Sequence, residues 1–180
     1  MIGDSAAIAV LGPTTADNAV QTDALAATLG SELARVGFAV VTHGDGPVAQ
    51  AVLRAARTGG GRVHPVVYPG ANEVEAESGT LDAQSAALTA LDRVLRLSDA
   101  VILLPGGLSA AALIVQVMLF GETQNGPFRQ TIIVGAGWTG KIGQLGDALG
   151  LDARQRAMLT FAETPQEAVE ALRYYVSGRT

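Results

Sequence analysis

The chain has 180 residues, a formal net charge of −5, no cysteine and only 4% aromatic residues. Without cysteine it has no disulfide, no thiolate nucleophile and no cysteine-ligated zinc, and with two histidines we expect no metal site. The acidic balance argues against a nucleic-acid partner, because phosphate backbones are bound by basic patches. The first residues carry an acid and no base ahead of an apolar run, unlike a secretory signal, so we expect a cytoplasmic protein.

Short apolar runs alternate with helical patterns along the chain. Runs rich in Val, Ile and Ala predict buried strands, and apolar residues spaced three and four apart predict the helices between them. Pro65 within the third run predicts an edge strand or a strand end. Residues 71–85 are polar and acidic and predict a solvated loop or a short helix. The expected strands are 6–11, 38–42, 62–68, 100–104, 131–134 and 158–161, and the expected helices are 19–36, 48–57, 86–97, 110–120, 141–149 and 165–176.

This alternation predicts an α/β fold with a parallel sheet covered on both faces. Right-handed crossovers then give a Rossmann-like, doubly wound sheet in a single domain that spans residues 1–180. In such sheets ligands bind beyond the carboxyl ends of the strands, where three glycine-containing turns are expected to converge on one cleft. These turns contain Gly12, Pro13 and Thr14 after the first strand, Gly44, Asp45 and Gly46 after the second, and Gly106, Gly107, Leu108, Ser109 and Ala110 after the fourth.

The turn after the fourth strand is the best candidate for an anion site. An apolar strand ends at Pro105-Gly106-Gly107, and an uncharged helix follows. The first N–H groups of a helix and the positive end of its dipole favour a phosphate. The uncharged run is long enough to span a bilayer, but the Pro-Gly-Gly interruption and the lack of basic flanks favour a buried strand and helix. We therefore expect no membrane association.

The second turn offers weaker signals. Residues 44–49 (GDGPVA) match the pattern G-x-G-x-x-A, but they follow the second strand rather than the first. Asp45 would repel a pyrophosphate there, so a structural turn is the better interpretation, with a contact to a ribose hydroxyl left open. His43, directly before this turn, is the titrating group near neutral pH that the expected cleft offers.

The order of these segments resembles the LOG family. GPTT follows the first strand, GGGRVHPVVYPG follows the second helix, and SDAVILLPGG contains the fourth strand. The closing MLTFAETPQEAVEALRYY also fits, so the resemblance covers nearly the whole chain. It implies a Rossmann-like homodimer that binds a nucleoside monophosphate at the Pro-Gly-Gly turn. It also implies hydrolysis of the N-glycosidic bond, which releases the free base and ribose 5-phosphate; we expect no cofactor.

This sequence departs from the family where the resemblance places the chemistry. In the family pattern PGGxGTxxE, Gly-Thr and the helix N-terminus hold the phosphate and the Glu is catalytic. Here Ser109 and Ala110 replace Gly-Thr, and Leu113 stands at the Glu position. The family usually has an Arg-Lys pair on the preceding helix, and Ala90 and Leu91 stand at those positions here. The sequence thus retains the Pro-Gly-Gly turn of the family pattern and lacks the side chains that the resemblance would make catalytic.

These losses affect catalysis more than binding. A missing general acid or base typically lowers a rate by about 10²- to 10⁴-fold, whereas backbone N–H donors survive any change of side chain. Arg93, one helical turn after Ala90, is a candidate for the missing cation, and a surface arginine is an equally good interpretation. His43 and Arg93 are therefore the two candidate catalytic residues.

We therefore expect a LOG-like protein that binds a nucleotide or related phospho-ligand and is catalytically degenerate. One alternative is an active nucleoside 5′-monophosphate phosphoribohydrolase. Another is a non-catalytic partner subunit, or a carrier of a phosphorylated cofactor such as the molybdopterin carriers that resemble this family. The helix from Ala110 to Phe120 is apolar on all sides, so we expect its outer face to form a homodimer interface.

Overall fold

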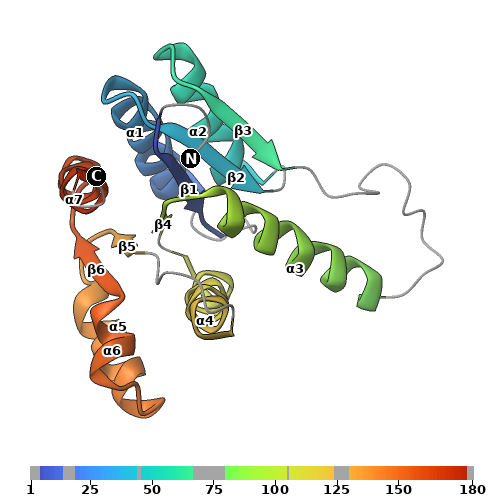
Figure 1. Cartoon of the computed structure of the whole chain (residues 1–180), viewed down its shortest axis with the longest axis vertical. Helices are drawn as coiled ribbons and strands as arrows, with labels where there is room; N and C mark the ends of the chain where they lie inside the picture. The colour runs from blue at the N-terminus through green and yellow to red at the C-terminus, as the bar shows by residue number, and fades with distance from the viewer. Residues whose placement is uncertain are drawn as a thin grey trace.

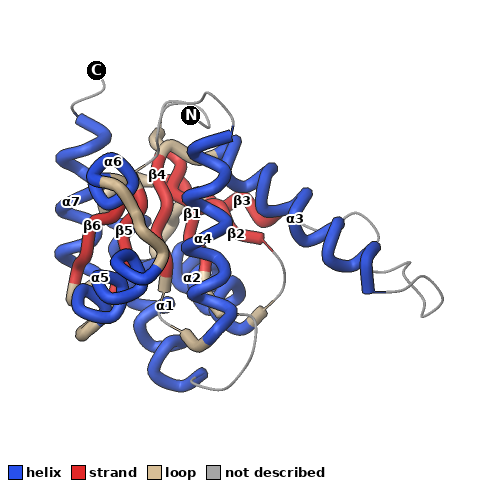
Figure 2. The backbone as a smooth tube through the Cα atoms, turned by 90° about the horizontal axis from the view of Figure 1, so that it is seen from below, coloured by secondary structure: helices blue, strands red, loops and turns tan. Residues whose placement is uncertain are grey.

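A computed structural model describes residues 5–13, 19–43, 46–66, 80–104, 106–123 and 130–177 of the chain. They form one six-stranded sheet in the order β3-β2-β1-β4-β5-β6, and every pair of neighbouring strands is parallel. Helices cover both faces of this sheet (Figures 1 and 2). This is the doubly wound strand order of Rossmann-like folds, so the predicted fold class is confirmed.

The predicted elements are present, with different ends except for the fifth strand, whose predicted ends are confirmed. The strands are β1 Ala7–Leu11, β2 Ala39–His43, β3 Val63–Val66, β4 Ala100–Leu103, β5 Thr131–Val134 and β6 Leu159–Ala162. The helices are α1 Ala19–Arg35, α2 Pro47–Thr58, α3 Thr80–Leu97, α4 Leu108–Thr123, α5 Trp138–Ala148, α6 Ala153–Ala157 and α7 Pro165–Ser177. Strand β3 lies at one edge of the sheet, as Pro65 predicted.

Two of these helices differ from the sequence-based expectation. Helix α3 begins at Thr80, within the segment for which a loop or short helix was expected, because residues 81–87 are mostly Leu, Ala and Gln, which have high helix propensity. Helix α6 was not predicted, since it is one short turn without an apolar face. It is held by a capping box in which Asp152 accepts from the Gln155 N–H and the Gln155 side chain accepts from the Asp152 N–H.

Each face of the sheet carries its own apolar layer. Helices α1, α2 and α7 pack on one face, and α3, α4 and α5 pack on the other. Along β1 the side chains alternate, with Ile8 and Val10 in the first layer and Ala9 and Leu11 in the second. A strand buried on both faces has no polar positions, which explains the continuous apolar runs in the sequence. Among the described residues, no helix is both long and apolar enough to cross a membrane.

Helices α1 and α2 approach each other closely at Gly30. A Cβ atom built on Gly30 would lie 2.4 Å from the Val52 carbonyl oxygen and 3.2 Å from the Ala55 Cβ. The absent side chain therefore allows the backbone of α2 to contact α1 directly.

This contact predicts opposite effects for two Gly→Ala substitutions. Alanine normally stabilises a helix interior by about 0.5–1 kcal/mol relative to glycine. We expect Gly143→Ala to do so, because a Cβ there meets no atom within 4 Å. Gly30→Ala should instead lower the free energy of unfolding by about 1–3 kcal/mol, because the methyl group overlaps α2. Urea denaturation measures both, and a stabilised Gly30→Ala variant would contradict the close packing.

Candidate functional site

The strand order of the sheet reverses between β1 and β4. The chain leaves β1 toward the face covered by α1 and α2, and leaves β4 toward the face covered by α4. The two strands remain paired to their carboxyl ends, where the Leu104 N–H donates to the Leu11 carbonyl at 2.8 Å. Beyond such a reversal the connections diverge and leave a crevice for a ligand.

The turns after β1 and β4 meet at this strand reversal. A Cβ on Gly106 would lie 2.6 Å from the Pro13 Cγ, so the two turns are in direct contact. A Cβ on Gly12 would lie 2.7 Å from the Val48 Cγ1, at the start of α2, and 3.3 Å from the Leu104 Cβ. The structure thus brings Gly12, Pro13 and Gly106 together, with the first turn of α2 behind them.

The third predicted turn is described only in part. Gly46 is the N-cap of α2 and adopts extended backbone angles, and its carbonyl accepts from the Gln50 N–H at 3.0 Å. The predicted site residues Thr14, Gly44 and Asp45 lie outside the described residues, as does Pro105.

The first turn of α4 faces open space. A Cβ on Gly107 would meet no atom of the described residues within 4 Å, Leu108 is exposed, and Ser109 is half-buried. Ala110 is buried beneath them. The first helical N–H groups have no carbonyl one turn earlier to bond to, so an N-terminus that opens on such a space is suited to hold an anion.

The positions that the LOG resemblance assigns to catalysis belong to the apolar core. Leu113 of α4 and Ala90 and Leu91 of α3 are all buried in the layer beneath α3, α4 and α5. These three positions supply no carboxylate, guanidinium or ammonium group. The carboxylate and the cations that the family pattern provides are therefore replaced by packing.

Arg93 does not point toward the turns. The residues of α3 that pack on the sheet are Ala90, Leu91, Val94 and Leu95, and Arg93 is exposed on the opposite side of the helix. It also lies in the second half of α3, which approaches the amino ends of the strands before β4 begins. The structure therefore separates Arg93 from the other predicted site residues.

His43 is the last residue of β2 and lies at the carboxyl edge. Residues two apart in a strand point to the same face, and Val41 packs in the layer beneath α3. The His43 side chain therefore also lies on the face covered by α3. Burial lowers the pKa of its imidazole below the ordinary 6.5, and a backbone hydrogen bond raises it by less. At neutral pH the imidazole is mainly uncharged, so it contributes no positive charge to an anion site.

Sequence reasoning overlooked the first turn of α5. Trp138 begins this helix, and the Lys141 ammonium lies 5.7 Å from the centre of its indole ring. The sequence signal for this turn is the segment GAGWTGK at 135–141, in which three glycines and a lysine follow a buried strand. That strand is β5, the neighbour of β4 in the sheet.

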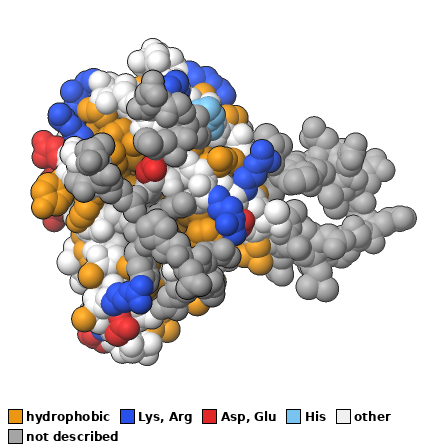
Figure 3. Space-filling model, in the orientation of Figure 1, with side chains coloured by type: hydrophobic (Ala, Val, Ile, Leu, Met, Phe, Trp, Pro, Cys, Tyr) orange, Lys and Arg blue, Asp and Glu red, His pale blue; other side chains and the backbone are white. Residues whose placement is uncertain are grey.

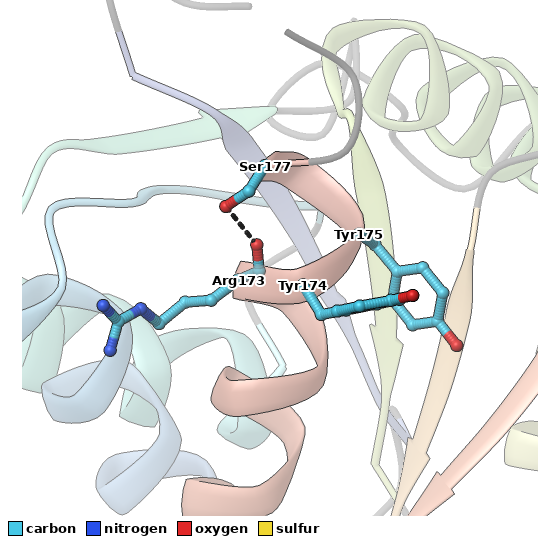
Figure 4. Close-up of a pocket in the computed structure, with 4 residues that line it drawn as sticks. All are labelled: Arg173, Tyr174, Tyr175 and Ser177. Atoms are coloured by element: carbon cyan, nitrogen blue, oxygen red, sulfur yellow. Dashed lines mark hydrogen bonds between the residues drawn. The ribbon is translucent and has the colours of Figure 1, made fainter.

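A shallow pocket lies elsewhere, at the end of α7. It is lined by Arg173, Tyr174, Tyr175 and Ser177, with the two tyrosine rings edge to face at 5.7 Å (Figure 4). The Tyr175 hydroxyl lies 3.1 Å from the Oγ1 of Thr160, near the start of β6. This pocket is therefore at the amino edge of the sheet, away from the three turns.

The lowered pKa of His43 predicts a loss of stability in mild acid. As the pH falls, the unfolded chain takes up a proton on His43 before the folded chain does. The stabilising contribution is complete above about pH 6.5 and falls as the pH drops below that value. We expect the urea midpoint of the wild type to fall more between about pH 7.5 and pH 5.5 than that of His43→Gln. Equal decreases in the two proteins would contradict the burial of His43.

The sequence matches no protein-family model and no curated protein. Several solved structures are similar. The protein TM1055 shares 22% identity with a TM-score of 0.66, over 94% of this chain and 99% of its own. The molybdenum cofactor carrier protein of Chlamydomonas reinhardtii shares 18% with a TM-score of 0.63, over 96% and 99%.

The molybdenum cofactor binding protein of the phototrophic bacterium Rippkaea orientalis shares 18% identity with a TM-score of 0.66, over 96% of this chain and 98% of its own. At these identities the likeness establishes the fold and leaves the ligand undetermined. The chain therefore has the Rossmann-like fold of these proteins along nearly its whole length.

Proposed function

We propose that this LOG-like chain binds a small phosphorylated ligand, of the nucleoside monophosphate class, at the first turn of α4. The observation that carries this proposal is the contact between Gly106 and Pro13 at the strand reversal, next to which Gly107 is exposed and no described atom would meet a Cβ on it. A phosphate in that space would accept hydrogen bonds from the first N–H groups of α4 and would lie at the positive end of its dipole. The half-buried Ser109 adds a hydroxyl donor on the same turn.

We propose further that the site binds without efficient catalysis. Cleavage of an N-glycosidic bond requires a proton donor for the leaving base and charge that stabilises an oxocarbenium-like centre. Leu113 occupies the position of the family's carboxylate, and it is packed in the core with 8% of its surface exposed. Backbone donors are unaffected by these replacements, so binding is retained where catalysis is lost.

Carriage of a phosphorylated cofactor is a second candidate function. It is favoured by two similar structures whose names describe the carriage or binding of the molybdenum cofactor. A carrier must hold its cargo without transforming it, which agrees with an anion turn that lacks a neighbouring carboxylate at Leu113.

We also propose that α4 pairs with a second copy of the chain. Leu108, Val115 and Leu119 lie along one side of α4 and are 87%, 37% and 52% exposed. The opposite side of the same helix packs on the sheet, so α4 is apolar on both sides. A contiguous exposed apolar stripe is typical of a protein interface, and a second copy brings the same stripe.

Ligand binding is tested by thermal unfolding with AMP, with adenosine as the control that lacks phosphate. A ligand at 100 times its dissociation constant should add about 2.7 kcal/mol to the stability of the wild type. We expect Gly107→Trp to abolish the AMP-dependent shift, because the indole fills the open space in front of α4. Gly107→Ala should retain the shift, since a methyl group there meets no neighbour. An unchanged shift in Gly107→Trp would place the site elsewhere.

The same samples distinguish binding from catalysis. After incubation with AMP, chromatography should detect no free adenine or ribose 5-phosphate above the level of a protein-free control. Turnover at rates typical of enzymes would overturn the degenerate site and favour the hydrolase. A shift with the molybdenum cofactor and none with nucleoside monophosphates would favour the carrier.

The α4 interface is tested by light scattering after size-exclusion chromatography. We expect twice the mass of one chain for the wild type and a single chain for Leu119→Glu, because a carboxylate in an apolar interface is costly to desolvate. Leu149→Glu is the matched control, since Leu149 is 55% exposed on α5, outside the α4 stripe. A monomeric wild type, or a dimeric Leu119→Glu, would contradict the interface.

A further inference from the structure

We infer that the shallow pocket at the end of α7 binds a small molecule that carries a quaternary ammonium group. This pocket lies at the amino edge of the sheet, so the inference goes beyond the function proposed above and does not depend on it. It follows from two tyrosine rings, from the hydrogen bonds that hold one of them, and from the charge around them.

The pocket is large enough for a whole small molecule. Its volume is about 660 Å³, within the range of about 300–1,000 Å³ that is usual for small-ligand sites. The residues that line it come from the last turns of α7 and are Arg173, Tyr174, Tyr175 and Ser177. Tyr174 is 79% exposed, so its ring is available to a ligand.

The rings of Tyr174 and Tyr175 form a corner of aromatic surface. Their centres lie 5.7 Å apart and their planes are inclined by 78°, so the two rings are nearly perpendicular (Figure 4). The face of an aromatic ring is negatively polarised and attracts a cation placed over it. Because the two rings are nearly perpendicular, one cation in the corner can contact both of them.

Hydrogen bonds hold the Tyr175 wall of this corner in place. The Tyr175 hydroxyl lies 3.1 Å from the Thr160 Oγ1, and the Gln130 amide donates to the same oxygen at 2.5 Å. The Gln130 amide also donates to the Met158 carbonyl at 3.3 Å. The ring is thus tied to the amino ends of β5 and β6, and less side-chain freedom is lost when a ligand binds against it.

The charge beside the exposed ring is negative. Glu170 is exposed and lies four residues before Tyr174, so the two side chains are neighbours on one side of α7. No described residue forms an ion pair with Glu170. The last turn of α7 contains no basic residue, and the negative end of the helix dipole lies there. Figure 3 shows hydrophobic and acidic side chains next to each other over α7.

The guanidinium of Arg173 is directed away from the tyrosine rings. Figure 4 shows its side chain extending from α7 on the side opposite to Tyr174 and Tyr175. The backbone carbonyl of Arg173 accepts a hydrogen bond from the Ser177 hydroxyl at 2.6 Å. The positive charge that belongs to the lining residues therefore does not lie in the aromatic corner.

These features select a weakly hydrated cation. A primary ammonium is strongly hydrated, and in a shallow pocket it would keep its water instead of contacting the rings. A quaternary ammonium has no N–H group that needs an acceptor, and its methyl groups can lie against the faces of Tyr174 and Tyr175. The Glu170 carboxylate, one helical turn away, then offsets the charge of the ligand.

The test is an NMR titration with choline and with dimethylbutanol, its uncharged carbon analogue. We expect choline to shift the tyrosine ring signals and to bind about fivefold more tightly than the uncharged analogue, because only choline gains the cation–π contact. Tyr174→Leu should weaken choline binding about fivefold, whereas Tyr174→Phe should retain it. Glu170→Gln should weaken it about twofold, and Glu163→Gln, the charge-matched control before the start of α7, should not change it.

Each other outcome counts against the cation site. An absent choline shift, equal affinity for the uncharged analogue, or unchanged binding in Tyr174→Leu would overturn it. An equal loss in Glu163→Gln and Glu170→Gln would also overturn it, because the effect would then depend only on net charge. Benzoate binding that is lost in Arg173→Met would show an anion site in its place. Because Tyr174 and Glu170 are exposed, we expect the unfolding midpoints of their variants to match the wild type, which serves as the control for folding.

Discussion

The pairing of β1 with β4 is the constraint on which the candidate site depends. At the amino end, the Asp99 carboxylate accepts from the Ala7 N–H at 2.9 Å, and the Asp99 N–H donates to the Ala7 carbonyl at 2.7 Å. At the carboxyl end, Gly106 packs on Pro13. Because the chain departs from these two strands toward opposite faces, their adjacency fixes the direction in which α4 presents its first N–H groups.

Binding and catalysis have different physical origins in this fold. The N–H groups that the proposed anion site would use belong to the backbone of α4 and follow from the course of the chain. A proton donor must come from a side chain, and at Leu113 that side chain is part of the apolar layer that holds α4 to the sheet. A carboxylate buried there would need a cationic partner to offset its desolvation, and Ala90 and Leu91 offer none. Apolar packing thus occupies the positions at which the LOG resemblance would place catalytic groups.

Charge is distributed unequally between the two edges of the sheet. Arginines such as Arg35, Arg57 and Arg96 close their helices, where a positive charge stabilises the negative end of the dipole. Those charges lie far from the strand reversal. Lys141 stands at the other edge, and the exposed Leu108 places the apolar stripe of α4 at the same edge. An anion site and a chain–chain interface would therefore share one end of α4.

The sequence by itself determined the six strands, their doubly wound arrangement and the edge position of β3, because apolar runs, glycine turns and Pro65 act locally. It also located the turns at Gly12 and Gly106. It did not show that α3 begins at Thr80, since helix propensity and polar composition compete there. The direction in which Arg93 points, away from the turns after β1 and β4, became clear only from the tertiary structure. That direction depends on how α3 packs on strands that are distant in the sequence, which no local pattern of residues records.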